Sequence, residues 1–105
     1  MPYFGCHLSP AGGYTAMIRT ACTLKADTLQ FFTRNPRGSR AKSPDPADVS
    51  RASWLLVQER FGPIVAHGAY TMNLCTREPE ARAVAAQVLT EDLNRAALLP
   101  GCLYN

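Results

Sequence analysis

The chain has 105 residues, of which 47% are hydrophobic and 18% are charged, and eleven Lys and Arg against eight Asp and Glu give a net charge of +3. This length allows one domain at most, and the ordinary composition excludes an intrinsically disordered chain. No run approaches the roughly 18 apolar residues of a membrane span. Residues 1–4 lack the basic head and apolar stretch of a signal peptide, so we expect a cytoplasmic protein.

The N-terminal part predicts two strands with a helix between them. Residues 3–8 are a short apolar run typical of a buried strand, and Gly12-Gly13 provides the turn before the helix. Residues 28–33, TLQFFT, are rich in β-branched and aromatic side chains and predict the second strand. The apolar residues of the predicted helix recur at helical spacing: Tyr14, Met17, Ile18, Ala21 and Cys22.

A second helix and a third strand are predicted next. Asp45 is expected to cap this helix with Pro46 at its first position, and Gly62-Pro63 is expected to stop it. Residues 64–66 predict a buried strand that ends at His67. The expected apolar face of the helix consists of Val49, Ala52, Leu56, Val57 and Phe61.

The C-terminal part predicts a long helix and the start of a fourth strand. Pro79 is expected at the start of the helix, Pro100-Gly101 beyond its end, and residues 102–105 are expected to begin the strand. The expected apolar stripe of the helix consists of Ala81, Val84, Ala85, Val88, Leu89, Leu93 and Ala96.

Strands that alternate with helices predict a parallel α/β sheet. Functional side chains in such folds lie on the loops after the strands, here residues 9–13, 34–45 and 67–78. A closed barrel needs eight such units over roughly 250 residues. The chain is therefore either part of a larger enzyme, or a protein that oligomerises or forms a small open sheet.

The four cysteines, Cys6, Cys22, Cys75 and Cys102, are unevenly spaced and contain no CxxC pair. In a reducing compartment such a set does not predict a disulfide framework, so we expect four buried thiols. Cys6 beside His7 does not predict a metal site, because neighbouring strand residues point to opposite faces.

The segment FFTRNPRGSRAK, residues 31–42, places four cations without an acid directly behind a predicted strand. The remaining seven cations and eight acids of the chain nearly cancel. A localised basic loop on a balanced protein favours an anionic partner such as phosphate, and the alternative is a solvated loop without a ligand. The four cations are Arg34, Arg37, Arg40 and Lys42.

Three segments at the predicted strand ends resemble the endonuclease IV family of apurinic/apyrimidinic endonucleases. They are FGCHLSPAGG at residues 4–13, FFTRNPRGSRAK at 31–42 and PIVAHGAYTMNL at 63–74, and LLPGCLYN at 98–105 resembles the start of the family's fourth strand. The family consists of metal-dependent (βα)8 TIM barrels related to xylose isomerase. The resemblance implies that residues 1–105 are a single partial α/β domain, the first three and a half units of such a barrel.

What the resemblance implies about chemistry is a cluster of three zinc ions and hydrolysis of the phosphodiester on the 5′ side of an abasic site in double-stranded DNA, a DNA-repair reaction. His67 matches the family's first zinc-ligand histidine, and His7 matches a histidine with a supporting role. The family's other ligands lie further along its sequence. We therefore expect the 105 residues alone to be inactive and unable to hold the zinc cluster.

The resemblance also implies two DNA-penetrating loops. Arg37 matches a basic residue that probes the base stack, and Tyr70 with Thr71 matches the tip of a second loop. Gly68-Ala69 stands where the family commonly has Ala-Pro or Asp-Ser between the histidine and the tyrosine, so we expect a looser loop. The remaining cations of the basic loop are expected to hold DNA phosphates: Arg34, Arg40 and Lys42.

Two other interpretations stay open. A sugar isomerase or epimerase of the same barrel superfamily would share the strand-end chemistry but would have no need for the basic loop. A non-catalytic partial barrel would self-associate or bind nucleic acid.

Overall fold

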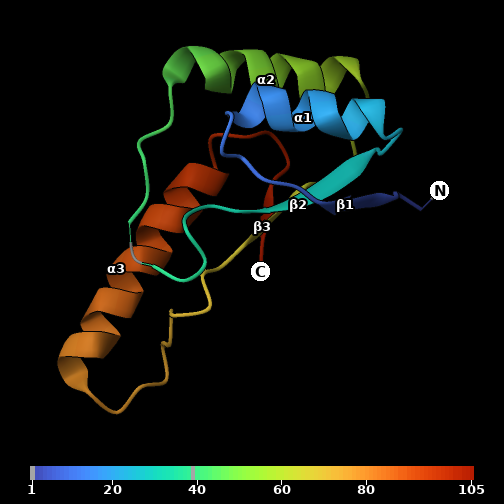
Figure 1. Cartoon of the computed structure of the whole chain (residues 1–105). Helices are drawn as coiled ribbons and strands as arrows, with labels where there is room; N and C mark the ends of the chain where they lie inside the picture. Colours follow the sequence, from blue (N-terminus) through green and yellow to red (C-terminus); the bar gives the residue numbers. More distant parts are fainter. Residues whose placement is uncertain (1, 39) are drawn as a thin grey trace.

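The computed structural model describes residues 2–38 and 40–105, so Met1 and Ser39, the latter in the 31–42 motif, lie outside the described residues. The described strands and helices alternate along the chain (Figure 1). They pair as one parallel sheet in the order β1-β2-β3-β4, which confirms the expected α/β fold. In chain order the elements are β1 (Gly5–His7), α1 (Tyr14–Thr23), β2 (Thr28–Phe32), α2 (Pro46–Gln58), β3 (Val65–His67), α3 (Pro79–Ala96) and β4 (Leu103–Tyr104).

Helices α1 and α2 are joined at their N-terminal ends by a carboxylate. Asp45 caps α2 as expected, because its side chain accepts a hydrogen bond from the backbone of Ala47, and Pro46 follows at the first helical position. Helix α1 begins after Gly13, which has no side chain to cap it. Asp48 of α2 replaces that cap, and the two helices lie side by side (Figure 1).

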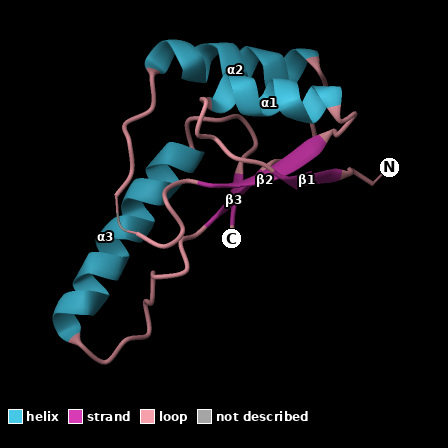
Figure 2. Ribbon diagram, in the orientation of Figure 1, coloured by secondary structure: helices cyan, strands magenta, loops and turns pink. Residues whose placement is uncertain are grey.

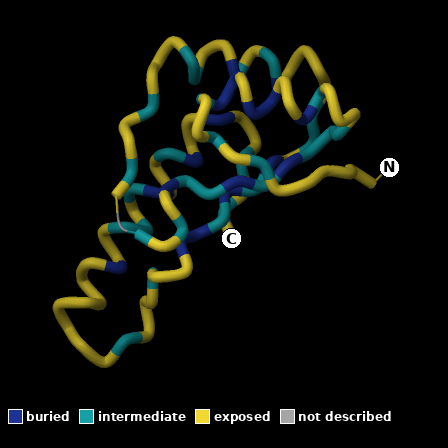
Figure 3. Tube along the Cα trace, viewed as in Figure 1, coloured by how far each residue is buried: buried dark blue, intermediate teal, exposed yellow. Residues whose placement is uncertain are grey.

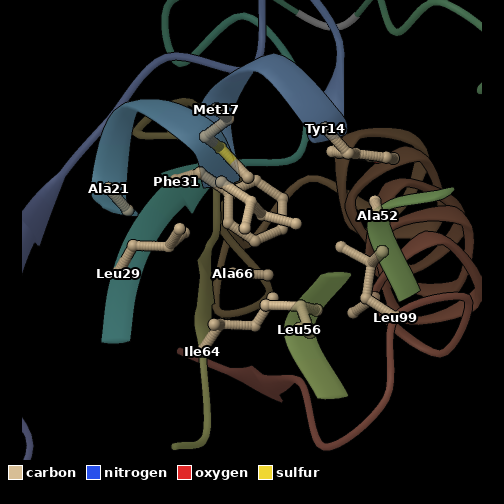
Figure 4. Packing of buried hydrophobic residues seen from close by; sticks show 12 residues of the cluster. Tyr14, Met17, Ala21, Leu29, Phe31, Ala52, Leu56, Ile64, Ala66 and Leu99 are labelled. Atoms are coloured by element: carbon tan, nitrogen blue, oxygen red, sulfur yellow. The ribbon is translucent and has the colours of Figure 1, made fainter. Parts of the chain in front are cut away.

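The hydrophobic core lies between these helices and one face of the sheet (Figure 4). Alternate residues of a strand point to opposite faces, so Leu29 and Phe31 of β2 are buried towards the helices, as is Ala66 of β3. The helices contribute residues at helical spacing. The core cluster consists of Tyr14, Met17, Ile18, Ala21, Leu29, Phe31, Ala52, Leu56, Ile64, Ala66, Ala96 and Leu99.

The opposite face of the sheet is only partly covered. Thr28, Gln30 and Phe32 alternate with the core residues of β2 and are half-buried, and His67 of β3 is half-buried on the same face. Figure 2 shows α1 and α2 together on one side of the strands. A four-stranded parallel sheet with helices on one face resembles part of the wall of a barrel. In such a barrel the face without helices lies on the inside.

Several burial expectations were wrong. Strand β1 is an exposed edge strand, shorter than the buried strand expected at residues 3–8, because no described helix packs over it. Val57 of α2 is 63% exposed, since α2 turns Ala52 and Leu56 to the core. The four cysteines are free, but Cys6 and Cys75 are exposed, and the other two are half-buried: Cys22 and Cys102.

Helix α3 buries only part of the expected apolar stripe. Val84 and Leu93 are exposed, and the buried residues of the helix are Ala85, Asp92 and Ala96. The N-terminal half of α3 extends away from the sheet, and most of its trace is exposed (Figure 3). In the described part of the chain, no helix combines the length and the apolar character needed to cross a membrane.

Candidate active site

Side chains from three strand ends gather around one aromatic ring. The ring of Phe32, the last residue of β2, lies 4.7 Å from that of His7, 5.0 Å from that of His67 and 5.2 Å from that of Tyr70, measured between centroids. Strand pairing explains this, because Phe32 is the register partner of His67. The structure therefore brings the two predicted histidines and Tyr70 together at the carboxyl ends of the strands.

The hydrogen bond of His67 selects its tautomer. Its Nδ1 lies 2.6 Å from the carbonyl oxygen of Gly68, which can only accept, so we assign the proton to Nδ1. In the neutral ring Nε2 then carries a free lone pair. An imidazole held at Nδ1 by a backbone carbonyl is the usual arrangement of a histidine metal ligand.

His7 makes the opposite arrangement. Its Nδ1 lies 3.0 Å from the side-chain nitrogen of Gln30, which donates, so we assign Nδ1 as acceptor and place the proton of the neutral ring on Nε2. A protonated Nε2 is a donor and does not bind a metal. This geometry is consistent with a supporting role for His7.

The basic loop turns tightly just after β2. The side chain of Asn35 accepts a hydrogen bond from the amide of Arg37 at 3.0 Å, and its carbonyl accepts from Gly38 at 3.1 Å. Arg37 is thus presented at the tip of a turn and is exposed. The carbonyl of Pro36 accepts a hydrogen bond from the amide of Tyr70 at 2.9 Å, which joins the loop after β2 to the loop after β3.

Arg34 differs from the other three cations of this segment, because it is buried and paired with acids of α3 whereas Arg37, Arg40 and Lys42 are exposed. Arg34 is 6% exposed, and its Nε lies 2.8 Å from Oδ1 of the fully buried Asp92. Its Nη2 lies 3.0 Å from Glu91. Burial lowers the pKa of Arg34, but the hydrogen bonds to the two carboxylates outweigh it and raise the pKa overall. The guanidinium is a charged structural group.

Asp92 itself was missed by sequence reasoning. It sits in α3 four residues after Val88 and four before Ala96, on the face expected to be apolar. An acid in the middle of an apolar stripe is a signal of a buried ion pair, because a lone carboxylate is not buried without a partner. Tyr104 of β4 also donates to Asp92, at 3.0 Å.

A cleft of roughly 730 Å³ separates the loop after β1 from the loop after β2. Of the predicted basic residues, Arg34, Arg40 and Lys42 line it. Arg51 of α2 lines it as well, although the sequence did not single it out. The sequence could have indicated this position, because Arg51 comes three residues after Asp48 and so lies on the same face of the helix.

The loop after β3 is held more firmly than its Gly68-Ala69 sequence suggested. Both residues are buried, the amide of Gly68 donates to Asn105 at 2.7 Å, and the carbonyl of Ala69 accepts from Met72 at 3.2 Å. Tyr70 and Thr71 remain exposed beyond this anchor.

The donor set fits one metal-ligand position. Within residues 2–38 and 40–105, no three His, Cys, Asp or Glu side chains are grouped so that they could hold an ion together. His67 has the tautomer and the location of a ligand, and a zinc cluster would need further donors from outside this set.

A parallel sheet with helices on one face, and with imidazole and aromatic side chains at its strand ends, has the architecture of part of a TIM barrel. The crystal structure of endonuclease IV from Thermus thermophilus superimposes on 98% of the chain, and 39% of that structure is covered, with a TM-score of 0.89 and 31% identity. No protein-family model matches.

Curated relatives agree with this match. The chain is 53% identical over 105 residues to the probable endonuclease 4 of Akkermansia muciniphila, covering 100% of this chain and 38% of the relative. It is 46% identical over 101 residues to that of Alkaliphilus oremlandii, covering 96% and 36%. The chain belongs to the endonuclease IV family, and it corresponds to the N-terminal portion of the family's members. It spans little more than a third of the length of these relatives.

Proposed function

We propose that this chain supplies the first strands, one metal ligand and two DNA-binding loops of a zinc-dependent endonuclease that cleaves DNA at abasic sites during repair in the cytoplasm. The reaction is hydrolysis of the phosphodiester on the 5′ side of the lesion. The observation that carries the proposal is the hydrogen bond from Nδ1 of His67 to Gly68, because it frees Nε2 at the carboxyl end of β3.

In this proposal His67 binds zinc through Nε2, and the Gly68 carbonyl fixes the ring orientation. Bound zinc supplies a Lewis acid and an acidified water for phosphodiester hydrolysis. His7 packs against Phe32, accepts a hydrogen bond from Gln30 at Nδ1, and does not bind the metal.

Two tips engage the duplex. Arg37 at its turn and Tyr70 beside Thr71 enter the DNA near the missing base, where unstacking costs least. The hydrogen bond between Pro36 and Tyr70 sets the spacing of the two tips. The three exposed cations that line the cleft hold phosphates: Arg40, Lys42 and Arg51.

Residues 1–105 work in this proposal as one partial α/β domain. The half-buried face around Phe32 and the exposed edge strand β1 require further strands to close the barrel. We propose that the remaining units of an endonuclease IV barrel cover this face and this edge. In their absence the chain would self-associate through the same face.

The test is a chimera in which this chain replaces the corresponding N-terminal residues of the Akkermansia muciniphila enzyme, chosen for its 53% identity. The chimera is expected to bind zinc and incise a duplex with a single abasic site. His67→Ala should lose zinc and lower incision by at least about 100-fold, more than the loss of a supporting group. His7→Gln is the matched control and should retain the zinc content.

Full zinc content and incision in the His67→Ala chimera would refute the assignment of this ligand. Salt dependence separates a DNA enzyme from a sugar isomerase, because each phosphate contact adds about 0.9 to the slope of log affinity against log salt concentration. A flat salt response of a folded chimera would favour the isomerase.

A further inference from the structure

A buried carboxylate of α3, that of Asp92, is connected to the loops that follow β2 and β3. Asp92 is 0% exposed, and its Oδ1 accepts from Nε of Arg34 at 2.8 Å while its Oδ2 accepts from the hydroxyl of Tyr104 at 3.0 Å. Arg95 brings a second cation to within 3.5 Å of the same carboxylate. One side chain of α3 therefore binds β4 and the start of the basic loop together.

The contact continues into both loops. Arg34 lies two residues after the end of β2 and immediately before the turn at Asn35. That turn carries Pro36, whose carbonyl accepts from the amide of Tyr70 at 2.9 Å. Asp92 is thus connected to Tyr70 in three steps: the hydrogen bond to Arg34, the backbone from Arg34 to Pro36, and the hydrogen bond from Pro36 to Tyr70.

We propose that Arg34 and Asp92 are positioning residues, which hold the turn at Asn35 and the loop at Tyr70 in register for DNA without touching it. The inference rests on the proposed function for its ligand, duplex DNA with an abasic site. Loop tips that insert into a duplex need a rigid base, because a displacement of about 1 Å is enough to weaken a site. A buried pair with several hydrogen bonds supplies such a base.

The substitution Asp92→Asn separates positioning from direct electrostatics. It removes a negative charge from a chain of net charge +3, so electrostatics alone predicts equal or tighter binding to DNA. Positioning predicts weaker binding to the abasic duplex, by about five- to tenfold, the effect of losing one coupled contact. The salt slope should stay the same, because Asp92 is buried and a positioning role gives Arg34 no contact with phosphate.

Amide hydrogen exchange in the 105-residue chain provides the second measurement. Asp92→Asn and Arg34→Lys should each speed exchange of the Tyr70 amide by about tenfold or more relative to Ile18 in α1. Leu56→Ala is the control: it removes a core side chain of α2, outside the pair, and should speed both amides equally. A merely structural role for the pair would also give equal acceleration and would overturn the proposal.

The outcomes distinguish the two proposals. Equal or tighter binding by Asp92→Asn, or an unchanged Tyr70 exchange ratio, overturns the positioning role. A change of about 0.9 in the salt slope on Arg34→Met would show that Arg34 contacts a phosphate directly, which also overturns it. Absence of DNA binding by the unmodified chain and by the chimera counts against the proposed function, and the exchange ratio still decides whether the pair holds the loops.

Discussion

The carboxylate of Asp48, in the first turn of α2, lies 2.7 Å from the backbone nitrogen of Tyr14, at the start of α1. Its other oxygen accepts from the amide of Thr15 at 3.1 Å. Helix α1 is thus capped by a residue that lies far along the chain. The carboxylate fits there because Gly13 has no side chain: a Cβ at that position would lie 3.1 Å from it.

We expect Asp48→Ala to lower the free energy of unfolding by about 1–2 kcal/mol, because two N-terminal amides of α1 lose their acceptor. Urea unfolding followed by circular dichroism measures the change. Asp45→Ala, which removes the single capping bond of α2 to Ala47, is the matched control and should cost less. An Asp48→Ala chain as stable as the unmodified one would show that α1 needs no cap from α2.

The stability that Asp48 provides should depend on pH. Burial raises the pKa of this carboxyl, but the hydrogen bonds from Thr15 and Tyr14 outweigh it, so the pKa lies below its ordinary value. A lowered folded pKa means that the stabilisation is present above about pH 4, the unfolded value, and is lost as the pH falls through the folded value. The difference in unfolding free energy between the unmodified chain and Asp48→Ala should therefore shrink as the pH falls below about 4. A constant difference would contradict this cause.

Tyr104 should titrate late. Burial, together with the hydrogen bond to Asp92, raises its pKa from 10.0 to about 12. Its contribution to stability is complete below about pH 10 and is lost as the pH rises through about 12. The difference in ultraviolet absorbance between the unmodified chain and Tyr104→Phe, followed as the phenol ionises, isolates this one group. A midpoint near the ordinary value of 10.0 in that difference titration would argue against the buried bond.

Gly5 is expected to tolerate no side chain. A Cβ at this position would overlap the backbone carbonyl of Thr28, its register partner in β2, and a backbone group cannot swing aside as a flexible side chain can. Gly5→Ala should cost about 2 kcal/mol or more in unfolding free energy, within the range of overpacking. Gly12→Ala is the control, because its Cβ would lie 3.6 Å from Ala16, an ordinary contact. Equal stability of the two variants would refute the predicted overlap.

The 105-residue chain by itself should not cut DNA. His67 fits one ligand position, and one imidazole does not hold a zinc cluster. Purified chain incubated with zinc and a duplex carrying one abasic site should leave the strand intact and retain no stoichiometric zinc after desalting. Zinc-dependent incision by this chain, abolished by His67→Ala, is the result that would overturn the prediction.

Local signals predicted the elements well. Asp45 and Pro46 set the start of α2, and Pro79 set the start of α3, because capping and ring geometry act over a few residues. Burial was predicted less well where it depends on neighbours. Val84 and Leu93 have apolar side chains at helical spacing, but both stay exposed, because the described elements leave their face of α3 uncovered.

The sequence by itself determined the order of strands and helices, the parallel sheet, and the placement of His67 and Tyr70 at one end of it. Alternation of strand and helix constrains the topology so strongly that no distant contact is needed to predict it. Only the tertiary structure decided that Arg34 faces inward. Its partner Asp92 is 58 residues away in the sequence. The local sequence around a loop arginine does not show whether the side chain will contact water, a phosphate or a buried carboxylate. The folded arrangement decides between these, because burial of an arginine depends on whether an acid is already in place to receive it.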